Sequence, residues 1–281
     1  MGYAAQNQLP PLQAAEQIGA LCKQLGLQIL SLNPLKNFEG NLTVPLAERL
    51  AQAAEWVDLA AAAGAHSVQV PSQFAPHSTG DFAVIVPELR ALADLAAARG
   101  VGVAYEAVAF AAHHATWQDS LRIAAAVGRA GFGLCLDSYH IHARLWGDPC
   151  AADGRRPGGE RAVRDSMAEF LASCPRETVR YVQLSDASRL DPPLTDDSPL
   201  FDGLEVRDPR LAWSRSARPF PLEAPGYLPV VDIARTWLID YGWDQWVSLE
   251  GFLAETEREE NGPEVMAERA RKSIDELYKR L

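Results

Sequence analysis

Cysteine is scarce in this sequence, with four residues in 281, and the four have no metal-binding spacing. They are Cys22, Cys135, Cys150 and Cys174. A disulfide framework belongs to short secreted chains with many cysteines, and zinc modules need closely spaced pairs. Neither pattern is present. We therefore expect reduced thiols, which are typical of a cytoplasmic protein.

Basic residues are also few, since the sequence has 26 lysines and arginines but 37 aspartates and glutamates. The net charge of -11 argues against a phosphate-backbone partner, so we expect no nucleic-acid binding. No apolar stretch is long enough to span a bilayer. Residues 1–13 lack the basic start and apolar core of a secretion signal. We expect a small-molecule substrate, no membrane association and a cytoplasmic location.

What the sequence does contain is a regular alternation of short apolar runs and amphipathic segments. Strands are predicted at 27–33, 66–72, 101–107, 132–138, 179–185 and 246–251. Helices are predicted at 10–26, 45–63, 84–99, 116–130, 161–173, 230–241 and 263–280. Such alternation is typical of parallel βα units. The predicted fold class is therefore α/β, with one (β/α) TIM-type barrel domain over residues 1–281.

Two features complicate this barrel. A complete barrel has eight strands, and the first two have no counterpart before residue 27, because the chain begins at a helix. Either the chain is shortened at its N-terminus, or another element or subunit covers its start. A homo-oligomer is therefore one of the alternatives. The segment 186–228 is rich in prolines and charges and is predicted to be a long functional loop without regular structure. The acidic stretch 255–260 is predicted to be a solvated loop.

Oxygen-bearing side chains interrupt four of the predicted strands. They are Glu106, Asp137, Gln183 and Glu250. A buried carboxylate or amide is costly unless it is paired or bound to a metal, and the C-terminal ends of parallel strands are where such folds bind ligands. Three carboxylates and one amide suit a hard divalent cation, Mg²⁺ or Mn²⁺, with Co²⁺ as a further option. The alternative is that each residue faces water or a helix N-terminus.

At these residues the chain resembles the xylose-isomerase-like barrels and, within them, the fungal-type 3-dehydroshikimate dehydratases. The segments that carry the resemblance are LCKQLGLQILSLNPLKNFEG, HSVQVPS, YEAVAFAAHHATWQDS, GLCLDSYHIHARL, YVQLSDA, WSRSARPFPLEAPGYLPV and WVSLEGF. The metal-ligand motifs are shared by many isomerases and epimerases, whereas WSRSARPFPLE with GYLPV is more specific to the dehydratase branch. The resemblance implies that Glu106, Asp137, Gln183 and Glu250 bind the metal.

The resemblance also implies a reaction, the loss of water from 3-dehydroshikimate to give protocatechuate in quinate and shikimate catabolism. A bound divalent cation would stabilise the enolate, and a neutral histidine would take the proton α to the ketone. His113 is the preferred base and His140 the second. Arg218 would hold the substrate carboxylate, with Arg215 as its competitor.

Each of these roles has a structural alternative. His113 is equally compatible with an exposed loop position, and His140 with a hydrogen bond to a metal-bound carboxylate. Arg218 has acidic residues of the 186–228 segment as alternative partners.

Other functions share the same residues. A sugar isomerase or epimerase would keep the four metal ligands and need no carboxylate clamp. A shortened, catalytically silent barrel would serve in binding or structure and would have no tight metal site. An abasic-site endonuclease is disfavoured by the acidic charge and by too few candidate histidine ligands.

Overall fold

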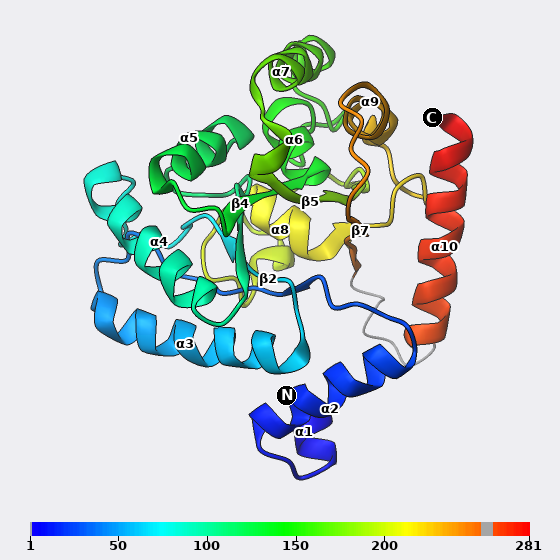
Figure 1. The fold of residues 1–281 in the computed structure, drawn as a ribbon. Helices are drawn as coiled ribbons and strands as arrows, with labels where there is room; N and C mark the ends of the chain where they lie inside the picture. The colour runs from blue at the N-terminus through cyan, green and yellow to red at the C-terminus, as the bar shows by residue number, and fades with distance from the viewer. Residues whose placement is uncertain (1, 254–260) are drawn as a thin grey trace. The chain divides into compact units, whose positions relative to one another are not determined.

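The computed structural model describes residues 2–253 and 261–281 (Figure 1). The chain divides into two units. The first unit comprises residues 1–107 and 111–135, and the second comprises 108–110 and 136–281. Strand β4 (Phe132–Asp137) begins in the first unit and ends in the second. The single-domain organisation stays a prediction, and the acidic stretch 255–260 lies outside the described residues.

The first unit is a parallel sheet with its crossover helices. Its strands are hydrogen-bonded in the order β1 (Ser31–Leu32), β2 (Ser67–Pro71), β3 (Gly102–Glu106) and β4. Its helices are α1 (Gly2–Gln6), α2 (Pro11–Gln24), α3 (Leu46–Ala63), α4 (Phe82–Ala97) and α5 (Trp117–Val127). Consecutive helices pack on one another from α2 to α5. This is the arrangement that the alternating pattern predicts.

The second unit continues the same βα order with the end of β4, then β5 (Val179–Leu184) and β7 (Val247–Leu249). Its helices are α6 (Ser138–Leu145), α7 (Gly159–Ser173), α8 (Pro209–Ser216), α9 (Val230–Arg235) and α10 (Pro263–Arg280), with short turns at Arg176–Thr178 and Pro199–Phe201 and a π-helical turn at Thr236–Asp240. The six predicted barrel strands are thus confirmed. No helix among the described residues is both long and apolar enough to cross a membrane.

The prediction that segment 186–228 lacks regular structure is wrong, because this segment contains helix α8 and strand β6 (Ala217–Arg218). Strand β6 pairs antiparallel with β8 (Phe252–Leu253). Asp208 caps α8 by accepting the N–H of Arg210, and Trp213 is fully buried on the helix. Pro209 and Asp208, which suggested a loop, are instead the first residue and the N-cap of a short helix.

Strands β2, β3 and β4 carry different chemistry on their two faces. Side chains alternate along a strand, and one face holds apolar residues: Val68, Val70, Val103, Tyr105, Leu134 and Leu136. The opposite face of the same strands holds Gln69, Glu106, Cys135 and Asp137, all buried. Burying each Val or Leu contributes about 1.5–3 kcal/mol. The apolar face therefore stabilises the sheet, while the polar face is left for chemistry.

A buried ion pair holds the loop after β1. Arg49 of α3 makes two contacts with Glu88 of α4, with Nη2–Oε1 at 2.6 Å and Nη1–Oε2 at 2.9 Å. Glu88 Oε2 also accepts the N–H of Gly40 at 2.7 Å, and Arg49 donates to the carbonyl of Phe38. Gly40 is left-handed (φ 63°), and a Cβ there would lie 2.1 Å from the Thr79 carbonyl. The pair thus fixes the turn that only glycine fits.

Replacing Glu88 tests this clamp. We expect Glu88→Ala to lower the free energy of unfolding by about 3–5 kcal/mol, because the Arg49 charge stays buried without its partner. Urea denaturation would measure the loss. The matched control is Asp165→Ala, which breaks the exposed Arg161–Asp165 pair at 3.3 Å and should change stability by less than about 0.5 kcal/mol. Equal effects for the two variants would contradict the clamp.

Candidate metal centre

Three of the predicted oxygen ligands meet in the second unit. Asp137 is the last residue of β4, and its Oδ1 caps α6 by accepting the N–H of Tyr139 at 2.8 Å. Gln183 lies in β5 and Glu250 directly follows β7. The Glu250 carboxyl lies within hydrogen-bonding reach of the side chains of Asp137 and Gln183. Consecutive strand ends therefore bring the three groups together, as parallel strands should.

Arg218 lies between the two carboxylates of this group. Its Nη2 is 2.6 Å from Asp137 Oδ2 and 2.9 Å from Glu250 Oε2. It also donates to the hydroxyls of Ser185 and Ser214, and the guanidinium carbon lies 4.3 Å from the centre of the Tyr139 ring. The side chain is 1% exposed. Arg218 thus pairs with strand-end acids and not with acids of the 186–228 segment.

The electrostatics of this group show how strongly it attracts positive charge. Burial and the neighbouring Asp137 carboxylate raise the pKa of Glu250, although Arg218 opposes the rise. Burial alone would raise the pKa of Asp137, but the Arg218 charge holds it below its usual range. The buried Asp137 carboxylate and the partly exposed Glu250 carboxylate therefore share one guanidinium. This donor set, two carboxylates and an amide oxygen, fits a hard divalent cation.

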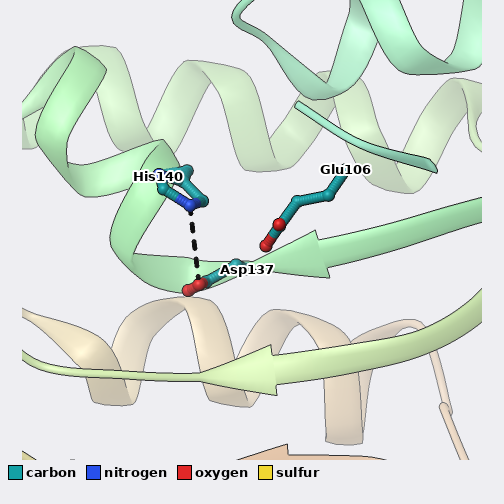
Figure 2. A group of neighbouring side chains, drawn as sticks. All are labelled: Glu106, Asp137 and His140. Carbon is teal, nitrogen blue, oxygen red and sulfur yellow. Dashed lines mark ion pairs between the residues drawn. The ribbon is translucent and has the colours of Figure 1, made fainter. Parts of the chain in front are cut away.

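His140 contacts Asp137 from the first turns of α6 (Figure 2). Its Nε2 is 3.8 Å from Asp137 Oδ2, and its Nδ1 accepts the N–H of Ala109 at 3.1 Å. Burial lowers the pKa of His140 to about 3, so the ring is neutral at pH 7. Because Nδ1 accepts a hydrogen bond, the neutral ring carries its proton on Nε2. At 3.8 Å, Nε2 lies close to the Asp137 carboxylate but beyond hydrogen-bonding distance, and the occupied Nδ1 makes His140 a poor base.

Glu106 ends β3 in the first unit. It pairs in register with Cys135 of β4, and its Oε2 accepts a hydrogen bond from Gln69 Nε2 at 2.8 Å. Strand β4 continues for two residues beyond Cys135 to Asp137, and residues two apart point to the same face. Figure 2 draws this strand end with its labelled side chains.

The other two predicted site residues are more exposed. His113 is on an exposed loop of the first unit, where its Nε2 is 3.1 Å from the Ser78 hydroxyl. Arg215 is on α8, 3.8 Å from Glu205, and its side chain is 39% exposed. Arg215 is thus paired within the 186–228 segment.

Asp186, which follows β5, was not predicted as a site residue. Its carboxylate accepts the backbone N–H groups of Ala187 (2.7 Å), Leu222 (3.2 Å), Tyr227 (3.0 Å) and Leu228 (2.9 Å). It thereby fixes the chain that follows Arg218. The only signal in the sequence is an acid directly after a strand, and that signal does not reveal its distant partners.

Glu39 is a second buried acid that the sequence analysis did not identify. Its Oε1 accepts the Tyr105 hydroxyl at 2.8 Å and the Gln73 N–H at 2.7 Å. Among the described residues, its Oε2 has no hydrogen-bond partner. Burial raises the pKa of Glu39 to about 7.

The family described as xylose isomerase-like TIM barrel matches residues 1–277. The chain belongs to this family. A solved structure described as the IolI protein with a binding zinc atom superposes with a TM-score of 0.67 at 20% identity, over 94% of this chain and 81% of that one. That likeness supports the xylose isomerase-like barrel fold alone.

Two proteins that are similar to this chain in sequence are both named 3-dehydroshikimate dehydratase. The protein from Neurospora crassa is 33% identical over 266 residues, which are 92% of this chain and 73% of the relative. The protein from Pseudomonas aeruginosa is 32% identical over 216 residues, which are 75% of this chain and 28% of the relative. The matched region therefore spans most of the length of the Neurospora crassa protein and about a quarter of the length of the Pseudomonas aeruginosa protein.

The raised pKa of Glu39 predicts a pH dependence of stability. In the unfolded chain the group loses its proton near pH 4.5, whereas in the folded chain it does so near pH 7. Folding therefore takes up a proton between these values, and stability falls as pH rises from about 4.5 to about 7. We expect the ionisation of Glu39 to lower the free energy of unfolding by about 2–4 kcal/mol between pH 5 and pH 8.

Glu39→Gln isolates that contribution, because glutamine resembles the protonated acid. Urea denaturation at pH 5, 6.5 and 8 should show a flatter pH dependence in Glu39→Gln than in the wild type. The control is Glu48→Gln, which changes an exposed glutamate in the first turn of α3. Identical pH profiles for Glu39→Gln and the wild type would contradict the prediction.

Proposed function

We propose that the chain is a divalent-metal-dependent dehydratase that converts 3-dehydroshikimate to protocatechuate. The observation that carries this proposal is the set of oxygen donors at consecutive strand ends, Asp137, Gln183 and Glu250, in a chain 33% identical to a protein named for that activity.

In this proposal Asp137, Gln183 and Glu250 hold the cation, and Glu106 is the fourth ligand. The register of Glu106 with Cys135, two residues before Asp137 on the same face of β4, supports its inclusion. A bound Mg²⁺ or Mn²⁺ supplies a Lewis acid for a substrate ketone oxygen. His140, whose Nε2 lies 3.8 Å from Asp137 Oδ2, borders the proposed cation site.

The proton α to the ketone is proposed to go to His113. His140 is the weaker candidate, since its Nδ1 is occupied by the Ala109 N–H and its Nε2 carries the proton. The exposed ring of His113 contacts the Ser78 hydroxyl through Nε2, and Nδ1 is its second nitrogen for proton transfer. Departure of the hydroxyl with that proton completes the loss of water and leaves a cyclic dienone. A keto–enol shift, which moves a proton from the ring CH2 group to the ketone oxygen, then makes the ring aromatic.

A second candidate is a sugar isomerase or epimerase with the same metal ligands. It is favoured by one observation, the engagement of Arg218 with Asp137 and Glu250. An arginine with those partners is not reserved for a substrate carboxylate. A neutral sugar would require no such clamp.

The reaction itself is the first test. Purified protein with 3-dehydroshikimate and Mn²⁺ or Mg²⁺ should produce a rising ultraviolet band of the aromatic product, and EDTA should abolish it. Glu250→Gln should weaken Mn²⁺ binding at least tenfold in calorimetry and remove the product band, because a carboxylate ligand is lost.

The exposed variant Asp165→Asn serves as the control and should bind Mn²⁺ like the wild type. Mn²⁺ binding without any product band would favour the sugar-enzyme candidate. An absence of saturable Mn²⁺ binding would favour a catalytically silent barrel.

Arg218 separates the two enzymatic candidates. For a dehydratase, Arg218→Ala should lower kcat/KM by about 10²–10³-fold in the presence of saturating metal, since a bidentate carboxylate contact is lost. Arg218→Lys should recover part of that loss. A matched control is Arg215→Ala, which removes a half-exposed arginine.

Thermal melting must accompany the Arg218 kinetics, because Asp137 and Glu250 lose their buried partner in both variants. We expect a stability loss of about 3–5 kcal/mol for Arg218→Ala without metal. Unchanged kcat/KM in a folded, metal-loaded Arg218→Ala protein would count against a carboxylate substrate.

A further inference from the structure

The polar face of the first unit contains a residue whose position next to Glu106 calls for a functional explanation. Gln69 lies in the middle of β2, where all five residues are buried, and it is itself 3% exposed. A buried amide is costly unless its donors and acceptors are satisfied. Its partner in register on β3 is a small residue, Ala104. The sheet alone does not require glutamine here.

The Gln69 amide is directed at one carboxylate. Nε2 donates to Glu106 Oε2 at 2.8 Å and lies 3.8 Å from the Cys135 sulfur. The Cys135 thiol lies 3.9 Å from Glu106 Oε1. The two oxygens of Glu106 therefore have different neighbours, an amide N–H for Oε2 and a weak thiol donor for Oε1.

We propose that Gln69 is the positioning residue of Glu106, holding Oε2 so that a divalent cation binds this carboxylate through Oε1 alone. The inference rests on the proposed metal-dependent function. An N–H donor fixes the rotamer of the carboxylate before the cation arrives, which reduces the entropy lost on binding. Glutamine suits this task and glutamate does not, because a second carboxylate at 2.8 Å would repel Glu106.

The test is Mn²⁺ titration calorimetry on the full chain with Gln69→Leu, which keeps the approximate volume and removes the donor. We expect the dissociation constant for Mn²⁺ to rise about 10–100-fold, the range found for residues that orient metal ligands. The frozen-solution electron paramagnetic resonance spectrum of bound Mn²⁺ should also change. A purely structural role for Gln69 would leave that spectrum unaltered.

The matched control is Ser67→Ala on the same strand. Ser67 is also buried and donates to the Leu30 carbonyl at 3.2 Å, but it pairs with Gly102, four residues before Glu106. Its removal should leave Mn²⁺ affinity within about twofold of the wild type. A second variant, Gln69→Asn, keeps an amide that is too short to reach Oε2 and serves if Gln69→Leu does not fold.

The outcomes separate the two proposals. A folded Gln69 variant with wild-type Mn²⁺ affinity and spectrum overturns the positioning role, whatever the activity. A wild-type protein that binds Mn²⁺ but gives no protocatechuate overturns the proposed reaction, while the comparison of Gln69→Leu with Ser67→Ala still decides the role of Gln69. A wild-type protein that binds no Mn²⁺ overturns both.

Discussion

The arrangement of the second unit depends on the attraction between one buried guanidinium and two carboxylates, of which one is buried and the other partly exposed. Arg218 contacts both Asp137 and Glu250 and is almost completely removed from water. Separating such charges is expensive in a protein interior, and leaving either carboxylate unpaired would cost several kcal/mol. The elements that carry these groups are thereby tied to one another: the end of β4, the residue after β7, and β6 with its helix α8. The same negative charge makes this place suitable for a divalent cation.

Buried acids recur throughout the chain, and each is stabilised differently. Glu88 has an arginine, Glu39 is stabilised by keeping its proton, and Asp186 accepts four backbone N–H groups. Glu106 has the amide of Gln69. In all four cases the acid lies beside a strand end or the loop that follows it. The acids therefore order the loops that a barrel uses for function, in addition to any chemical role.

The division of the strands into an apolar and a polar face explains how these acids are tolerated. Each strand gains its stability on the face that packs Val, Leu and Tyr against helices, so the other face is free to carry Gln69, Glu106 and Asp137. Period-two alternation keeps the two faces separate along every strand. A one-residue shift in register would bury the acids among the helices, which makes the register strongly specified.

The sequence by itself determined the six strands, their order and the strand-end residues, because local periodicity and glycine-terminated helices specify βα units directly. It did not reveal α8 within 186–228, since a short helix with one buried tryptophan has too few apolar positions to stand out. The tertiary structure alone decided that Arg218 pairs with Asp137 and Glu250, that the Ala109 N–H fixes the His140 tautomer, and that Gln69 holds Glu106. Each of these contacts joins residues 31 to 81 positions apart. Contacts of that kind depend on which strands and loops become neighbours on folding, and no local pattern encodes that.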